Sequence, residues 1–220
     1  MPVKVGLKHI EIWNDSMEKY VQKYEEENAA ALQDQIVFYG PSNFTRWSER
    51  WGMTPLREAV VGKSGAPCCV NRGFGSSCPE HQLYYYDRLV RPLTPRVLVY
   101  SPGFGNGRAF GYSLEESWEL AQRVIAYASA DFPEIRILLC GSQPRKLPSE
   151  EQIANARLWD SWLKEFAEAT ESCRFVDVSA CAALGDPELF VKDGVHYNER
   201  GYARYADFFR EVLKDELARY

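Results

Sequence analysis

The feature of this sequence that most constrains its fold is a regular alternation of short apolar runs with longer helix-prone segments. Each run is five or six residues long and is followed by glycine, proline or a polar residue, which is typical of a buried strand that ends in a turn. Strands that alternate with helices predict a parallel sheet with helices on both faces. The predicted strands are Gln35–Tyr39, Ala66–Val70, Arg96–Ser101, Ile135–Cys140 and Arg174–Val178.

The helix-prone segments carry capping and periodicity signals. Ser113-Leu-Glu-Glu116 is a Ser-x-x-Glu capping box. From about Ile10 to Leu32 the apolar residues fall near one face, so we predict a lead-in helix within residues 1–33 that packs on one domain, residues 34–220. The other predicted helices are Pro79–Val90, Ser113–Ala130, Ser149–Thr170 and Asn198–Arg219.

Composition narrows the choice of partners and compartment. The chain has 26 basic and 31 acidic residues in 220, a net charge of −5, so we expect no nucleic-acid partner. No run approaches the roughly 18 apolar residues of a membrane span, and the N-terminus lacks a signal-peptide core, so we expect a cytoplasmic protein that is not integral to a membrane. Six cysteines without a Cys-x-x-Cys pair predict reduced thiols. With only three histidines, a zinc site would have to be assembled from scattered ligands, so the sequence does not support one and we assign no metal ligands. A homo-oligomer is left open.

Ser42 follows the first predicted strand, where ligands bind in a parallel sheet. A serine between a strand and a helical turn lies beside free N–H groups, which favour a nucleophile. The alternative is that Ser42 only caps the following helix. The segment Gly40-Pro-Ser-Asn-Phe44 ends in phenylalanine, so it is not the Gly-x-Ser-x-Gly elbow of α/β-hydrolases.

A second motif, Asp193-Gly-Val-His196, lies near the C-terminus before the last predicted helix. A carboxylate three residues before an imidazole, in a turn that contains glycine, can accept the Nδ1 proton and leave Nε2 as a general base. The alternative is a turn residue followed by an unrelated surface histidine, since one such match often arises by chance.

Taken together, these motifs resemble blocks of the SGNH, or GDSL-like, hydrolase family, over a span from about Gln35 to the end of the last helix. Four segments carry the likeness in the family's order and spacing, and the last meets the pattern Asp-Gly-x-His-x-Asn-x-x-Gly-Tyr in full. These segments are Phe38–Trp47, Asn71–Ser77, Tyr86–Tyr100 and Asp193–Tyr202.

The resemblance implies a fold and a mechanism. The fold is α/β, a three-layer α/β/α flavodoxin-like sandwich with a five-stranded parallel sheet, in a single SGNH hydrolase domain. In the mechanism, Ser42 attacks an ester carbonyl, His196 takes and returns the proton, and Asp193 orients His196. Water then cleaves the acyl-enzyme, and neither a metal nor an organic cofactor is needed.

The sequence departs from the family at the oxyanion hole. The family uses the nucleophile's amide, a second-block glycine and a third-block asparagine. Ser76 stands at the glycine position unless a one-residue slip brings in Gly75, and Gly105 stands where the asparagine belongs, with Asn106 next to it. Loss of one donor typically lowers the rate by about 10²- to 10³-fold. The expected donors are therefore drawn from Ser42, Gly75, Ser76, Gly105 and Asn106.

The third-block segment Pro102–Tyr112 also carries the predicted substrate-binding residues, Phe104 and Arg108. Aromatic rings at a cleft rim stack on sugars or line acyl pockets, although plain packing is the alternative for most of them. The glycines of this segment do not complete Gly-x-Gly-x-x-Gly, because Arg108 holds the last position, so nucleotide binding is not expected.

These observations predict a lipase-like serine esterase that removes short acyl groups, above all acetyl, from an alcohol such as a carbohydrate. Its partner is a small-molecule ester. The alternatives are a lysophospholipase or thioesterase that acts on longer chains, and a catalytically impaired binding module on the same scaffold.

Overall fold

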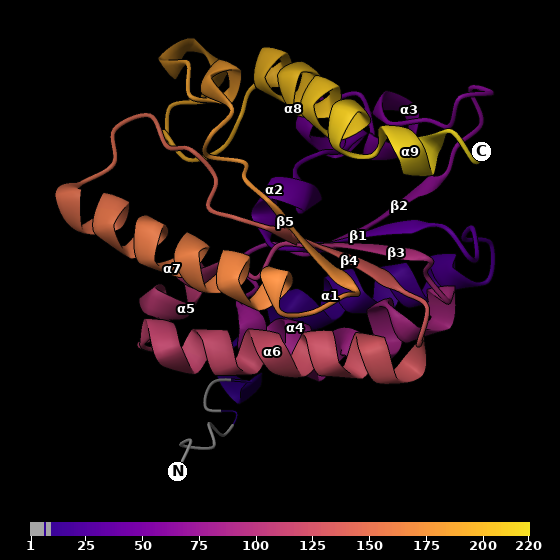
Figure 1. Ribbon diagram of the computed structural model, residues 1–220, viewed down its shortest axis with the longest axis horizontal. Coiled ribbons are helices and arrows are strands. Elements are labelled where there is room, and N and C mark those ends of the chain that lie inside the picture. The colour runs from indigo at the N-terminus through magenta and orange to yellow at the C-terminus, as the bar shows by residue number, and fades with distance from the viewer. Residues whose placement is uncertain (1–6, 8–9) are drawn as a thin grey trace.

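The computed structural model describes residue 7 and residues 10–220, and its centre is a five-stranded sheet (Figure 1). All strands are parallel, in the order β2-β1-β3-β4-β5. The chain therefore reverses its direction of winding at β1, and ligand crevices form at such points. The strands are β1 (Ile36–Gly40), β2 (Cys69–Gly73), β3 (Val97–Tyr100), β4 (Arg136–Cys140) and β5 (Cys173–Val176).

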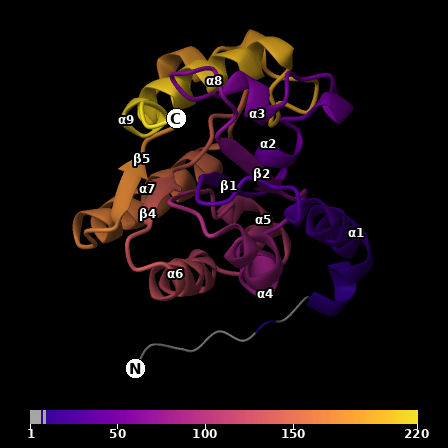
Figure 2. The same ribbon diagram turned by 90° about the vertical axis from the view of Figure 1, so that its right-hand side faces the viewer.

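Helices cover both faces of the sheet, which confirms the predicted three-layer α/β/α fold. Figure 2 shows α3 and α8 on one side and α4 and α6 on the other. One face packs against α1 (Ile10–Asn28), α4 (Pro79–Leu89), α6 (Leu114–Asp131) and α7 (Glu150–Glu168), and the other against α2 (Ser42–Thr45), α3 (Leu56–Ala59), α8 (Glu199–Val212) and α9 (Lys214–Leu217).

The two cores follow from the period of two along each strand. Val37 and Tyr39 point into the core shared with α1, α4, α6 and α7, whereas Ile36 and Phe38 point into the core shared with α2 and α8. Every residue of β1 is buried, as expected for a central strand of a parallel sheet.

Several predicted boundaries were wrong. The second strand starts at Cys69 instead of Ala66, because Pro67, which has no N–H, forms an isolated antiparallel bridge with Val61 instead. The last predicted helix is two helices, α8 and α9, separated at Leu213. The third-block segment, predicted as a loop, contains a short helix, α5 (Phe104–Ala109). Four 3₁₀ turns complete the described part: Glu49–Trp51, Arg91–Leu93, Ala182–Leu184 and Pro187–Leu189.

The lead-in helix α1 ends at Asn28, earlier than predicted. Met17 and Val21 lie in the core, and Arg88 of α4 forms ion pairs with Glu18 (2.7 Å) and Glu25 (2.5 Å) of α1. Residues 1–6 and 8–9 of the predicted lead-in segment lie outside the described residues, and the division at residue 33 stays a prediction.

In the part of the chain that the structure describes, each helix is too short or too polar to cross a membrane. The cytoplasmic location and the oligomeric state stay predictions. The six cysteines are free thiols, and Cys181 alone among them is not fully buried.

Candidate active site

Ser42 lies just beyond the carboxyl end of β1, as the first residue of α2. Two glycines let this short helix lie close to the strands. A Cβ on Gly73 would lie 2.5 Å from the Cβ of Phe44. A Cβ on Gly40 would lie 3.1 Å from the ring of Phe44 and 2.9 Å from the Cβ of Ser101, at the end of the neighbouring strand. A larger residue at either position would push α2 or its entry turn away from the sheet edge.

Two side chains hold the carbonyl groups of α2. Asn71 in the middle of β2 donates from Nδ2 to the carbonyl of Phe44 (2.7 Å), and its Oδ1 accepts the N–H of Gly73 (2.9 Å). The hydroxyl of Tyr202 on α8 donates to the carbonyl of Asn43 (2.8 Å). The segment that carries Ser42 is therefore fixed both to the sheet and to the C-terminal helix layer.

His196 and Asp193 come from the turn before α8 and meet Ser42 at this edge. The Oγ of Ser42 lies 2.7 Å from Nε2 of His196, and Nδ1 of His196 lies 2.8 Å from Oδ2 of Asp193. The backbone N–H groups of Val195 and His196 both donate to Oδ1 of Asp193 (2.9 Å each). With Nδ1–H donating to the carboxylate, Nε2 is left to accept the proton of the Ser42 hydroxyl.

The surroundings of His196 and Asp193 favour a neutral imidazole and an ionised carboxylate, the protonation states in which His196 can accept the Ser42 proton. Burial is the main reason that the pKa of His196 is lowered; Arg46 lowers it further, and the hydrogen bond to Asp193 opposes the shift. Burial works against the charged form of Asp193, but hydrogen bonds from the N–H groups of His196 and Val195 outweigh it and hold the pKa of the carboxyl well below its usual range. A neutral imidazole beside an ionised carboxylate follows.

Arg46, on the turn after α2, is a third neighbour of this pair. Its guanidinium lies 3.2 Å from Oδ2 of Asp193 and 4.5 Å above the ring of Trp51. The carboxylate oxygen that faces His196 therefore also faces a fixed positive charge.

A cavity of about 690 Å³ opens beside Ser42. The segments that follow β1, β3 and β4 line it together with the first half of α7, so it lies at the carboxyl edge near the reversal point. Its volume falls in the range of small-molecule sites. We call it the Ser42 cavity.

The predicted oxyanion residues do not all reach this cavity. Ser42 and Gly105 line it, whereas Gly75 and Ser76 are not among its lining residues. Ser76 adopts the left-handed conformation (φ 61°) that its glycine-type position requires. Asn106 lines the cavity, but its Nδ2 donates to the carbonyl of Ser77 (2.8 Å), which engages this side chain.

The two predicted substrate-binding residues both line the Ser42 cavity. The ring of Phe104 packs against Trp159 of α7, with centroids 5.2 Å apart, so it forms part of the wall. Arg108 lies at the exposed rim and forms an ion pair with Glu151 (3.2 Å).

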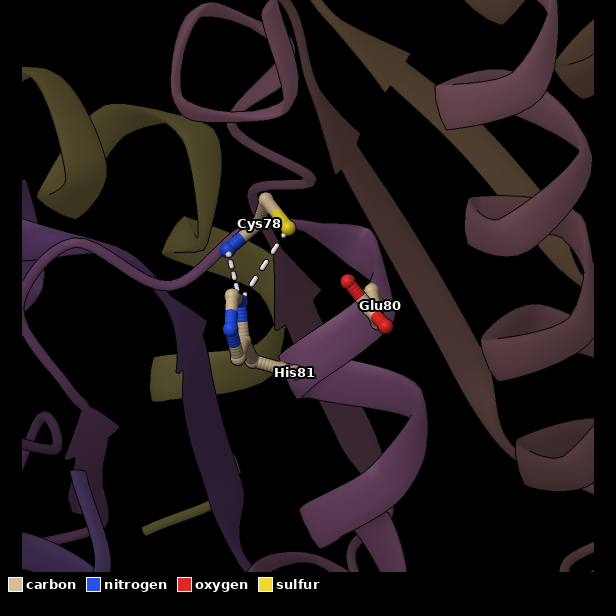
Figure 3. Close-up of side chains that lie close together, drawn as sticks. All are labelled: Cys78, Glu80 and His81. Atoms are coloured by element: carbon tan, nitrogen blue, oxygen red, sulfur yellow. Dashed lines mark hydrogen bonds between the residues drawn. The ribbon is translucent and has the colours of Figure 1, made fainter. Parts of the chain in front are cut away.

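One group of potential metal ligands lies elsewhere, at the start of α4. Figure 3 shows Cys78, Glu80 and His81, whose ligand atoms lie within 4.8 Å of one another. The group acts as a helix cap, because Nδ1 of His81 accepts the N–H of Cys78 (3.2 Å) and contacts its Sγ (3.1 Å). Burial raises the pKa of the Cys78 thiol to about 11, so the thiolate that a metal requires is disfavoured.

Sequence reasoning missed four residues around the site. Asn71, Arg46 and Tyr202 lie within the matched segments, but no role was derived for them. Arg145, in the segment after β4, lines the Ser42 cavity. The rule that ligands bind after strand ends would have directed attention to this segment, since β4 was predicted.

The five-stranded parallel sheet and its two helix layers define the three-layer α/β/α fold of SGNH hydrolases. No protein-family model matches the chain, and none of the curated proteins matches it either.

Several solved structures are similar in fold to this chain. A Streptococcus pneumonia protein named after platelet activating factor is 22% identical, with a TM-score of 0.71, over 94% of this chain and 96% of its own. A GDSL-like lipase from Bacteroides thetaiotaomicron is 18% identical (TM-score 0.65), over 89% of this chain and 98% of its own. A catalytic Ser-to-Ala mutant of an acetylxylan esterase from Geobacillus stearothermophilus is 14% identical (TM-score 0.63), over 83% of this chain and 95% of its own.

Proposed function

We propose that this protein is a serine esterase in which Ser42, His196 and Asp193 form the catalytic triad. The observation that carries the proposal is the hydrogen-bonded chain from the Ser42 hydroxyl through the imidazole to the carboxylate, with contacts of 2.7 and 2.8 Å. A serine that only capped α2 would not need the Nε2 atom of a histidine within hydrogen-bond distance of its hydroxyl. Moreover, the cap position of α2 is held by Pro41, and Ser42 is the first residue of the helix.

In the proposed reaction, His196 removes the hydroxyl proton as the Ser42 oxygen attacks the ester carbonyl. The carbonyl oxygen becomes negatively charged and points toward the start of α2, whose first N–H groups have no partner within the helix. His196 then gives the proton to the departing alcohol. A water molecule, deprotonated by the same imidazole, attacks the acyl-enzyme and releases the acid and free Ser42.

For the substrate, we propose a short acyl ester, with acetyl as the acyl group and a carbohydrate-like alcohol. The acetylxylan esterase and the family 3 carbohydrate esterase from Clostridium thermocellum among the structural neighbours support this choice. The polar side chains that line the Ser42 cavity, such as Gln143, Arg145 and Asn155, also offer hydrogen-bonding partners to a carbohydrate-like alcohol.

The first test of this proposal is Ser42→Ala with 4-nitrophenyl acetate. We expect kcat to fall by about 10⁶-fold, because the variant has no nucleophile. Ser161→Ala, on the exposed side of α7, is the matched control and should keep the parent rate. A Ser42→Ala protein that retains the parent rate would refute the mechanism.

Two further measurements separate the alternatives. A fluorophosphonate probe should label Ser42, whereas a binding module with an impaired site would form no adduct. Rates with 4-nitrophenyl acetate, butyrate and octanoate should fall along this series, and a maximum at octanoate would favour the lysophospholipase or thioesterase class.

A further inference from the structure

Two arginines that line the Ser42 cavity have no acidic partner among the described residues. They are Arg145, from the segment after β4, and Arg157, from α7. No carboxylate in the described part of the chain lies within ion-pair distance of either guanidinium, although most other arginines are paired. Arg145 is half-buried and Arg157 is exposed, so Arg145 is the less hydrated of these two unpaired charges. Two positive charges along one cavity, in a chain with net charge −5, favour a negatively charged ligand.

The acidic residues of the same cavity are already engaged. Glu151 pairs with Arg108 at the rim (3.2 Å). Asp160 accepts the N–H of Ser142 (2.7 Å) and its hydroxyl (2.8 Å), and burial raises the pKa of this carboxyl to about 6. Neither carboxylate neutralises Arg145 or Arg157.

Arg145 lies close to the reacting groups. Its Nη2 is 3.2 Å from the place where a Cβ on Gly105 would lie, so the guanidinium lies over the start of α5, and glycine at this position gives it room. Its positive charge also reaches the triad, because Arg145 is one of the groups that lower the pKa of His196, after burial and Arg46. Because Arg145 and Ser42 line the same cavity, the guanidinium is within the reach of a substrate bound at Ser42.

We propose that Arg145, assisted by Arg157, binds an anionic group of the ester, so that the substrate carries a carboxylate, sulfate or phosphate. This inference rests on the proposed esterase function. Guanidinium groups bind such oxyanions through two parallel N–H donors, which gives both affinity and orientation. With acetyl as the proposed acyl group, the anion lies on the alcohol part of the ester. A preference for an anionic acyl part would replace acetyl by a dicarboxylic acyl group, and matched probes distinguish the two.

The experiment compares charged and neutral members of two ester pairs. 4-Acetoxybenzoate and its methyl ester test the alcohol part, and mono-4-nitrophenyl adipate and its methyl ester test the acyl part. In one pair we expect the parent enzyme to favour the anionic member by about tenfold or more in kcat/KM, mainly through KM, as for a charge-assisted hydrogen bond.

Variants at Arg145 identify the group responsible. Arg145→Gln should remove the preference for the anionic ester, and Arg145→Lys should keep part of it. Arg204→Gln, on the exposed side of α8, is the control and should keep the preference. Equal kcat/KM values for both members of both pairs in the parent enzyme would overturn the proposal. The proposal would also be overturned if Arg145→Gln lowered kcat equally for charged and neutral esters. That result would mean that Arg145 stabilises the oxyanion of the reaction and not an anionic group of the substrate.

A binding measurement separates this inference from the esterase proposal. Calorimetry with 4-acetoxybenzoate and mono-4-nitrophenyl adipate on Ser42→Ala needs no turnover, and adding Arg145→Gln should weaken binding of the preferred anion by about tenfold or more. Arginine-dependent binding in a protein that hydrolyses no ester would refute the esterase function and support the anion site. Equal binding of both anions with and without Arg145 would refute the anion site alone.

Discussion

The two carboxylate oxygens of Asp193 have different partners. Oδ1 accepts two backbone N–H groups of its own turn, whereas Oδ2 faces Nδ1 of His196 and the guanidinium of Arg46. The first pair of bonds fixes the carboxylate in place, and the second places its charge where an imidazolium would form in the proposed mechanism. Arg46 competes for that charge, so it weakens the support that Asp193 gives to protonated His196.

At the scale of single residues, we predict how kcat/KM depends on pH. The general base must be neutral, so kcat/KM should rise with pH and level off above the pKa of His196, and burial places this midpoint below that of an ordinary histidine. Arg46→Gln removes a positive charge that disfavours the imidazolium, so it should raise the pKa and move the midpoint to higher pH. The pH profile of 4-nitrophenyl acetate hydrolysis measures this shift. A midpoint that moves to lower pH in Arg46→Gln would contradict the argument.

Three side chains that the structure brings together could be singled out from the sequence, because each lies in a short motif that follows a predicted strand or precedes a predicted helix: Ser42, Asp193 and His196. Asn71 and Tyr202 were not singled out, although their segments were. Their contacts with α2 join positions 27 and 159 residues apart. Only the packed fold shows which carbonyl a given side chain meets.

At the scale of elements, α2 depends on its surroundings for its position. It has four residues, too few for a helix to be stable alone. The glycine at the end of β2 lets it approach the sheet, and hydrogen bonds from β2 and α8 hold its carbonyl groups.

We therefore predict that Gly73→Ala displaces α2. Its Cβ would meet the Cβ of Phe44 at 2.5 Å and the N of Thr45 at 2.6 Å, both too close. The free energy of unfolding should fall by about 1–3 kcal/mol, as in overpacked cores, and kcat should fall because Ser42 moves away from His196. Gly185→Ala, where the nearest atom is 3.6 Å away, is the control for urea denaturation. Equal stabilities of the two variants would count against the role of this glycine.

Strands were easier to predict than the third-block helix. A run such as Val97–Tyr100 is apolar on both faces and ends abruptly, and a segment this short with that pattern is typical of a buried parallel strand. The helix α5 is rich in glycine, and Gly103, the residue before it, adopts the left-handed conformation. Its sequence has little helix propensity, so tertiary packing decides its structure.

At the scale of the whole molecule, the layer formed by α8 is packed largely through aromatic rings. Phe209 is fully buried, and its ring centroid lies 5.0 Å from that of Phe38, 6.3 Å from Phe44 and 6.1 Å from Trp47. One side chain of the last layer thus contacts β1 and the helix that carries Ser42.

Phe209→Ala should therefore lower the free energy of unfolding by about 3–5 kcal/mol, the usual cost of emptying a buried phenylalanine site. Phe208→Ala, on the same helix but only partly buried, should cost less than half as much. Thermal and urea unfolding measure both. A similar loss in the two variants would indicate that burial against β1 and α2 does not determine the stability of this layer.

The hydrogen bond between Ser42 and His196 joins residues 154 positions apart, and Tyr202 reaches back 159 positions to Asn43. During synthesis, Ser42 leaves the ribosome long before His196, its proposed base, exists. In the proposed mechanism, the unfinished polypeptide therefore carries an ordinary alcohol at this position, which becomes reactive only when the final helices dock. A truncated translation product would thus be inert toward esters, without any separate inhibitor or activating cleavage.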